Sequence, residues 1–124
     1  MLDRVASLLE RDFEIVGKTG DGNSAVVEAR QLEPDVVVLD ITMPVLNGIE
    51  AARELKRSGS TAKIVILTVH DDRDFLSECL SAGALGYVVK SRVATDLVLA
   101  IKEALMHLVF VSPTDALAGG LEAE

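Results

Sequence analysis

Residues 36–48 read VVVLDITMPVLNG, an apolar run that ends in an aspartate and passes directly into a loop. A parallel strand that is covered on both faces has such a continuous hydrophobic sequence. In open α/β sheets, ligands bind in the crevice beyond the carboxyl ends of the strands. Asp40 is therefore the first candidate for a functional carboxylate. The alternative is a turn or helix-capping role, but Pro44 and Asn47-Gly48 already supply the turn residues before the next helix.

Strand and helix patterns alternate on both sides of this run. Some segments carry apolar residues at helical spacing, and others form short apolar or β-branched runs. The helices expected are 2–11, 23–32, 49–57, 71–82 and 93–106, and the strands expected are 13–18, 35–39, 63–68 and 86–89. Asn23 or Ser24 is the expected cap of the second helix, and Asp71-Asp72 is expected to cap the fourth. Strands that alternate with helices indicate βαβ units, so the sequence predicts an α/β domain with a doubly wound parallel sheet.

The composition limits the classes of protein that remain. A chain of 124 residues with 49% hydrophobic residues is long enough for one domain with a single core. The sequence has no apolar stretch long enough to span a membrane and no secretory signal pattern after Met1. The lone Cys79 cannot form an intramolecular disulfide or a metal cluster, and we expect a cytoplasmic protein. A net charge of −8 without a basic stripe argues against direct binding of nucleic acid.

Two more polar residues stand at the ends of expected strands. Thr68 follows the apolar residues IVIL at 64–67, and Lys90 follows YVV at 87–89. Because parallel strands place their carboxyl ends at one edge of the sheet, Asp40, Thr68 and Lys90 are expected to converge there. A carboxylate can accept a phosphoryl group as a nucleophile, while a hydroxyl and an ammonium group can contact its oxygens. Taken singly, the threonine is explained by β-propensity and the lysine by solvation, so only the shared edge favours phosphoryl chemistry.

These motifs resemble the receiver domain of two-component response regulators, and most of all the receivers of LuxR-type regulators. The resemblance is carried by DVVVLDITMP at residues 35–44 with Asn47-Gly48, ILT at residues 66–68, AGA at residues 82–84 and GYVVKS at residues 86–91. It implies a flavodoxin-like doubly wound fold, with residues 1–113 as a receiver-like domain and residues 114–124 as a C-terminal tail.

The resemblance also implies a role for each residue of the expected site. Asp40 would accept a phosphoryl group from a histidine kinase, and the backbone carbonyl of Thr42 would bind Mg²⁺ together with Asp40. Thr68 would be the switch hydroxyl, and Lys90 would contact the phosphoryl group. Tyr87 matches the aromatic switch position of the family, although a packing role on a short strand is the alternative.

The sequence departs from the family pattern at its start. Family members begin with a strand that ends in two acidic residues, which hold Mg²⁺ beside the phosphoacceptor, whereas this sequence begins in what resembles the first helix. Mg²⁺ prefers octahedral coordination by oxygens, so one carboxylate and one carbonyl make a poor site. We therefore expect weak Mg²⁺ binding and at most weak phosphorylation of Asp40 by small phosphodonors, as in a truncated or atypical receiver.

The missing strand would be central in the order 2-1-3-4-5, and its neighbours would be left about 10 Å apart. Residues 107–112, which read HLVFVS, are the spare segment for this place. They are expected as a parallel strand between the 13–18 and 35–39 strands, as a circular permutation or by exchange in a domain-swapped homodimer. Asp115 would then emerge beside Asp40 and could substitute for a missing Mg²⁺ ligand. The alternative is a linker remnant packed on the last helix.

The function expected is phosphorelay signalling by a receiver without an effector domain. Helix 71–82, strand 86–89 and helix 93–106 would form the face that binds a protein partner or a second copy. No enzyme activity, membrane contact or nucleic-acid contact is expected. One alternative is a small phosphotransferase or phosphatase that uses Asp40 as its nucleophile, with His70 as the only nearby general-base candidate. Another is an interaction module that works without phosphorylation.

Overall fold

The computed structural model describes residues 2–14, 17, 21–41, 47–70 and 72–114. The described helices are α1 (Leu2–Leu9), α2 (Gly22–Leu32), α3 (Gly48–Arg57), α4 (Arg73–Ser81) and α5 (Val93–Leu105), with a short 3-10 helix η1 (Lys90–Arg92) before α5. The strands are β1 (Val36–Asp40), β2 (Lys63–Thr68), β3 (Gly86–Val89) and β4 (Phe110–Val111). None of the described helices is long and apolar enough to cross a membrane.

The four strands form one sheet in the order β1-β2-β3-β4, and every neighbouring pair is parallel. Asp40 lies opposite Leu67 in the β1–β2 register, and Thr68 lies opposite Val89 in the β2–β3 register. The last residues of the three longer strands therefore lie at one edge of the sheet. The α/β parallel fold predicted from the sequence is confirmed.

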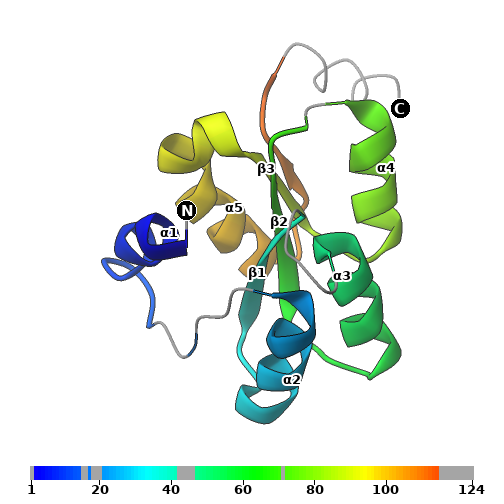
Figure 1. Ribbon diagram of the computed structural model, residues 1–124. Helices are drawn as coiled ribbons and strands as arrows, with labels where there is room; N and C mark the ends of the chain where they lie inside the picture. Colours follow the sequence, from blue (N-terminus) through cyan, green and yellow to red (C-terminus); the bar gives the residue numbers. More distant parts are fainter. Residues whose placement is uncertain (1, 15–16, 18–20, 42–46, 71, 115–124) are drawn as a thin grey trace.

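Helices cover both faces of the sheet (Figure 1), with α1 and α5 on one side and α2, α3 and α4 on the other. Successive strand residues point to opposite faces, so each strand contributes to two cores. Leu39, Ile66 and Tyr87 belong to the core beneath α2–α4, while Leu67 and Val88 belong to the core beneath α5 and α1. This arrangement is the doubly wound layering that the alternating pattern indicates.

The C-terminal strand lies at a different place from the predicted one. Phe110 pairs with Gly86 and Val111 pairs with Tyr87, so β4 extends the sheet beyond β3, on the side away from β1. The prediction that residues 107–112 fill a slot between 13–18 and 35–39 is wrong, and with it the circular permutation. The strand pairs within its own chain, and an exchange between two molecules is not needed to place it.

The segment before α2 also differs from expectation. Phe13, Glu14 and Gly17 are not in a strand, and the other residues of the predicted strand 13–18 lie outside the described part of the chain. Phe13 packs instead against the core beneath α1 and α5. Within the described residues β1 pairs only with β2, and its residues 36–38 are accordingly only partly buried. The apolar run had predicted fuller burial.

Capping residues set several helix starts. Asp21 caps α2 by accepting a hydrogen bond from the Ser24 backbone N–H, so the expected cap at Asn23 or Ser24 is wrong. Asp72 caps α4 in the same way, as predicted, while Asp71 lies outside the described residues. The Asx side chain belongs one residue before the helix, where it can reach the exposed N–H groups of the first turn.

Candidate functional site at the carboxyl edge of the sheet

Asp40 and Lys90 are in contact across the end of β2. Asp40 is the last residue of β1, and Lys90 is the first residue after β3. The Lys90 Nζ lies 2.7 Å from Asp40 Oδ2, and the two side chains are 16% and 23% exposed. A pair with this exposure is reachable by a small reactant but is less screened than a surface pair. Lys90 thus holds a positive charge beside the carboxylate that the sequence singles out.

Thr68 and Tyr87 are joined through the backbone of His70. The His70 N–H donates a hydrogen bond of 3.0 Å to Thr68 Oγ1, and the Tyr87 hydroxyl donates one of 2.7 Å to the His70 carbonyl oxygen. The side chains of Thr68 and Tyr87 are fully buried. Both hydroxyls therefore restrain the same residue of the loop that leads from β2 to α4.

Burial changes the interpretation of Tyr87. The sequence places this residue in an expected interaction face, yet its ring is enclosed and belongs to the core beneath α2–α4. Any effect of Tyr87 on a partner must pass through its neighbours, because its own side chain has no exposed surface. The hydrogen bond from the Tyr87 hydroxyl to the His70 carbonyl oxygen connects the ring to the loop after β2.

The structure shows the surroundings of His70 and of the buried Cys79. The His70 ring stacks on Phe75 with a centroid distance of 4.1 Å and an interplanar angle of 5°. Cys79 is fully buried, and burial, reinforced by the nearby Glu78 carboxylate, raises the pKa of its thiol to about 12. A thiol with this pKa is protonated at neutral pH and is not a nucleophile.

The start of α3 lies against the backbone of the phosphoacceptor candidate. A Cβ atom added at Gly48 would be 2.9 Å from the carbonyl oxygen of Asp40 and 2.9 Å from Ile41 Cα. Asn47 caps the helix and forms a reciprocal capping box with Glu50, which fixes this approach. The glycine that the sequence suggests as a turn residue is needed for close contact between two backbones.

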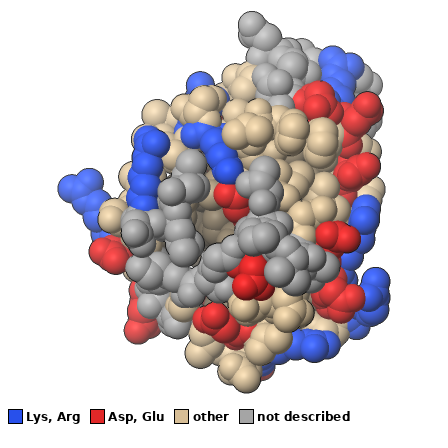
Figure 2. All heavy atoms as spheres, viewed as in Figure 1, with Lys and Arg blue, Asp and Glu red and all other residues tan. Residues whose placement is uncertain are grey.

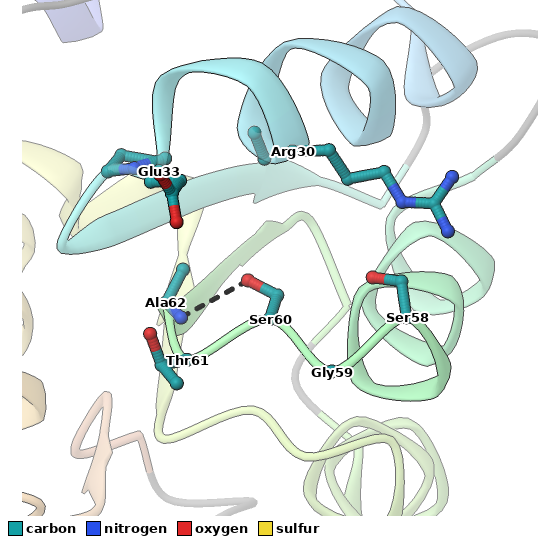
Figure 3. A pocket seen from close by; sticks show the side chains of 9 residues that line it. Arg30, Glu33, Ser58, Gly59, Ser60, Thr61 and Ala62 are labelled. Carbon is teal, nitrogen blue, oxygen red and sulfur yellow. Dashed lines mark hydrogen bonds between the residues drawn. The ribbon is translucent and has the colours of Figure 1, made fainter.

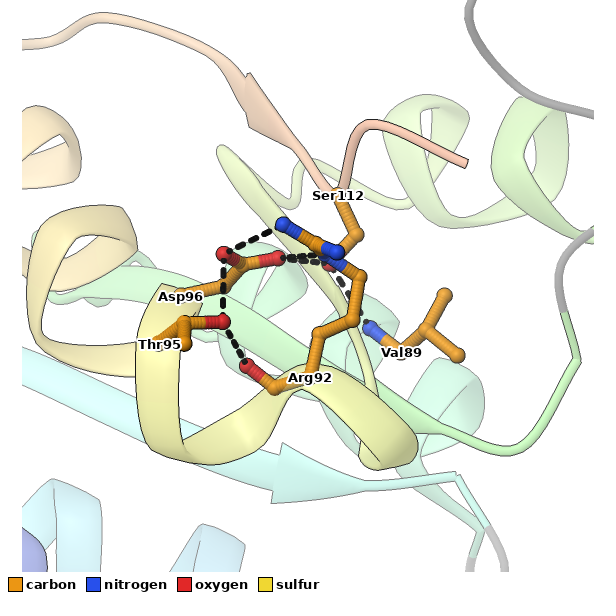
Figure 4. Close-up of polar contacts among 5 residues, drawn as sticks. All are labelled: Val89, Arg92, Thr95, Asp96 and Ser112. Atoms are coloured by element: carbon orange, nitrogen blue, oxygen red, sulfur yellow. Dashed lines mark hydrogen bonds and ion pairs between the residues drawn. The ribbon is translucent and has the colours of Figure 1, made fainter. Parts of the chain in front are cut away.

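A buried polar network lies next to Lys90 and was not predicted. Figure 4 shows Asp96 accepting hydrogen bonds from Arg92 (2.7 Å to Oδ2), Thr95 (3.1 Å) and Ser112 (2.9 Å). Burial raises the pKa of Asp96, but the hydrogen bonds from Arg92, Ser112 and Thr95 outweigh it and lower the pKa below 3.8. A sequence signal existed: Asp96 is four residues before Ala100 and so lies on the core-facing side of its helix.

The described residues do not fit a complete Mg²⁺ site. They contain no group of three or more His, Cys, Asp or Glu side chains that could hold a metal ion. The oxygen Oδ2 of Asp40 is in contact with an ammonium group, which repels a divalent cation. Thr42 and Asp115, the other predicted ligands, lie outside the described residues.

A separate pocket of about 220 Å³ opens at the other end of the strands, between the C-terminal ends of α2 and α3. Arg30, Glu33, Ser58 and Ser60 line it (Figure 3). The Ser58 hydroxyl donates to the Leu55 carbonyl, and Ser60 Oγ accepts a hydrogen bond from a backbone N–H two residues later. These two hydroxyls thus serve the turn after α3.

Acidic and basic side chains are interspersed over the face seen in Figure 2. They do not merge into a continuous basic stripe among the residues described on this face. This face therefore carries charges of both signs, in a chain whose net charge is −8.

Residues 1–102 match the model of the response regulator receiver domain, and the chain belongs to this family. It is 35% identical over 105 residues to the transcriptional regulatory protein DegU of Brevibacillus brevis, which covers 85% of this chain and 44% of that protein. It is 41% identical over 104 residues to PdtaR of Mycobacterium tuberculosis, which covers 84% of this chain and 50% of that protein. The chain thus spans about half the length of the curated relatives it matches.

Solved structures agree with the family. The crystal structure of a LuxR-family two-component response regulator from Aurantimonas sp. SI85-9A1 superposes with a TM-score of 0.88 at 33% identity, covering 98% of this chain and 89% of that one. The response regulator domain of Thermotoga maritima CheB gives a TM-score of 0.77 at 28% identity over 85% of this chain and 89% of that one. The resemblance to a LuxR-type receiver is confirmed.

Proposed function

We propose that this receiver domain takes part in a cytoplasmic phosphorelay in which Asp40 accepts a phosphoryl group from a histidine kinase. The observation that carries the proposal is the contact between Asp40 and Lys90 at the carboxyl edge of a receiver-family sheet. The contact supports the proposal because the ammonium group is already placed where negative charge would develop on a transferred phosphoryl group.

In the proposed reaction, a carboxylate oxygen of Asp40 attacks the phosphorus of a phosphohistidine. The O–P bond forms while the N–P bond of the donor breaks, and the imidazole nitrogen that leaves takes up a proton. No redox change or additional reactant is involved. The Lys90 ammonium group loses its direct contact with the carboxylate and instead contacts a phosphoryl oxygen, as a point charge suited to such an anion.

The response would then pass to the loop after β2. If the Thr68 side chain rotates to bring its hydroxyl to the phosphoryl group, the hydroxyl moves away from the His70 N–H. His70 then keeps its bond from Tyr87 and its stack on Phe75 but loses the bond to Thr68, and the position of α4 can change. We propose the exposed surfaces of α4 and α5 as the face that binds a protein partner or a second copy. Strand β3, which the sequence also assigned to this face, is buried and pairs with β4.

We further propose that the domain signals without enzymatic turnover and that Mg²⁺ assists phosphorylation only weakly in this chain. Support for the first point comes from the ring of His70, the general-base candidate of the sequence, which stacks on Phe75. Support for the second comes from the single carboxylate of the described site and the ammonium group in contact with it.

Intact-mass measurement after incubation with acetyl phosphate, with and without Mg²⁺, tests these proposals. We expect addition of a single phosphoryl group, at a low level, that Mg²⁺ increases only slightly. Asp40→Asn should abolish the addition. Asp35→Asn is the matched control, because Asp35 is exposed and precedes the opposite end of the same strand. Equal addition in wild type and Asp40→Asn would refute Asp40 as the acceptor, and continuous consumption of the donor without a stable adduct would favour the phosphatase alternative.

A further inference from the structure

The turn that carries Lys90 is fastened to the C-terminal strand on both sides. The backbone N–H of Val89, one residue before Lys90, donates a hydrogen bond of 3.0 Å to Ser112 Oγ. Two residues after Lys90, Arg92 binds Asp96 through its guanidinium group, and Ser112 Oγ donates to the same carboxylate. Figure 4 shows these groups pointing toward one another. Ser112 thus links Val89, which precedes Lys90, to Asp96, which binds Arg92 on the other side of Lys90.

We infer that Ser112 and Asp96 are positioning residues for Lys90, and that strand β4 with Ser112 forms a structural part of the phosphoacceptor site. This inference rests on the proposed function for its effect on phosphorylation. Neither residue lies within the Asp40–Lys90 contact, so both act through the backbone of the turn.

The geometry favours positioning over simple packing. Ser112 and Asp96 are 0% and 4% exposed, and a buried hydroxyl that both accepts and donates fixes the two groups that it joins relative to each other. The Ser112 N–H also donates to the Tyr87 carbonyl at 2.9 Å, which keeps the hydroxyl in register with β3. Without the hydroxyl, the Val89 N–H and one oxygen of Asp96 lose a partner at the base of the Lys90 turn.

The same tail offers a matched control. Thr114 is two residues after Ser112, and its hydroxyl oxygen is buried with no hydrogen-bond partner among the described residues. Thr114→Val removes a buried hydroxyl from the same segment without breaking a hydrogen bond, whereas Ser112→Ala breaks two that reach the Lys90 turn and Asp96. Comparing the two variants separates the effect of losing a buried hydroxyl from the effect of losing the hydrogen bonds of Ser112 to Val89 and Asp96.

The first measurement does not depend on phosphorylation. NMR of protein labelled at lysine Cε, with the Lys90 signal assigned from Lys90→Arg, reports the environment of the ammonium group beside Asp40. We expect Ser112→Ala and Asp96→Asn to shift this signal and Thr114→Val to leave it in place. If Ser112→Ala does not fold, Ser112→Cys has nearly the same volume and weaker hydrogen bonding, and it takes the same role in the comparison.

The second measurement is the rate of adduct formation with acetyl phosphate. We expect Ser112→Ala to lower the rate by about fivefold, the effect on Lys90 of losing the one bond of the two that reaches its turn directly, from the Val89 N–H, and Thr114→Val to leave it unchanged. A Lys90 signal and a rate that stay at wild-type values in a folded but less stable Ser112→Ala protein would overturn the inference. If the wild type itself takes up no phosphoryl group, the proposed function fails while the Lys90 signal still decides the positioning role.

Discussion

Removing the Tyr87 hydroxyl and the Thr68 hydroxyl, singly and together, should reveal whether they act on one shared loop. Tyr87→Phe keeps the buried ring and removes a 2.7 Å hydrogen bond to the His70 carbonyl. Thr68→Val keeps the side-chain shape and removes the acceptor of the His70 N–H. Each change should lower the free energy of unfolding by about 0.5–1.5 kcal/mol, the net value of one such bond.

The double variant should cost less than the sum of the single variants. Both hydroxyls restrain His70, so the loop that is loosened by one loss gains less restraint from the hydroxyl that remains. We expect a coupling of about 0.5–1 kcal/mol, within the range for residues that share a partner. Tyr87→Ala is unsuitable for this purpose, because truncating a fully buried aromatic ring costs about 3–5 kcal/mol and can unfold a marginally stable domain.

The assay is urea denaturation of the four proteins followed by circular dichroism, with m-values compared to verify a common unfolded state. Tyr87→Phe combined with Ser60→Ala is the control cycle. Ser60 Oγ bonds a backbone N–H just before β2, at the opposite end of that strand from Thr68, so these two losses should add. Additivity within about 0.3 kcal/mol in the Thr68–Tyr87 cycle would refute a shared restraint on His70.

Two further changes test the packing near the site. Gly48→Ala should lower the free energy of unfolding by about 1–3 kcal/mol and shift the backbone amide signals of Asp40 and Ile41, because the added methyl group meets backbone atoms at 2.9 Å; unchanged signals would contradict this contact. The pKa of Asp96 is lowered in the folded state, so its carboxylate contributes stability that is complete well above pH 3.8 and is lost as the pH falls through the folded pKa. The difference in free energy of unfolding between wild type and Asp96→Asn should therefore shrink as the pH falls below 3.8. Urea denaturation at a series of pH values measures this difference, and a difference that stays constant would contradict the prediction.

Local sequence was sufficient for much of the fold because β1, β2 and β3 each carry their own signal. The run at residues 36–39 and the run at 64–67 are apolar and flanked by polar residues. This pattern predicts that each run is a strand and also which residue stands at its carboxyl end. Once parallel pairing is inferred, the proximity of Asp40 and Lys90 depends only on where their strands end. The observed contact of 2.7 Å lies at the edge that this reasoning indicates.

The position of β4 did not follow from local sequence. A two-residue strand has almost no periodicity, and its β-branched and aromatic residues fit the predicted place beside β1 as well as the observed one beside β3. The choice between the edges is made by tertiary contacts: Phe110 packs into the core beneath α5, and Ser112 bonds Asp96 from 16 residues away. Such long-range partners have no signature in a single sequence beyond a polar residue on an apolar helix face.

Strand β3 is the element on which both polar connections of the site depend. The Tyr87 hydroxyl holds the His70 loop on the side of α4, while the Tyr87 carbonyl accepts the N–H of Ser112 from the tail. Three residues further along the chain, Lys90 reaches Asp40. Because a strand alternates its side chains and directs its backbone groups sideways, these contacts leave β3 in different directions without competing. The Lys90 turn, the tail and the His70 loop are therefore all attached to one short, buried strand.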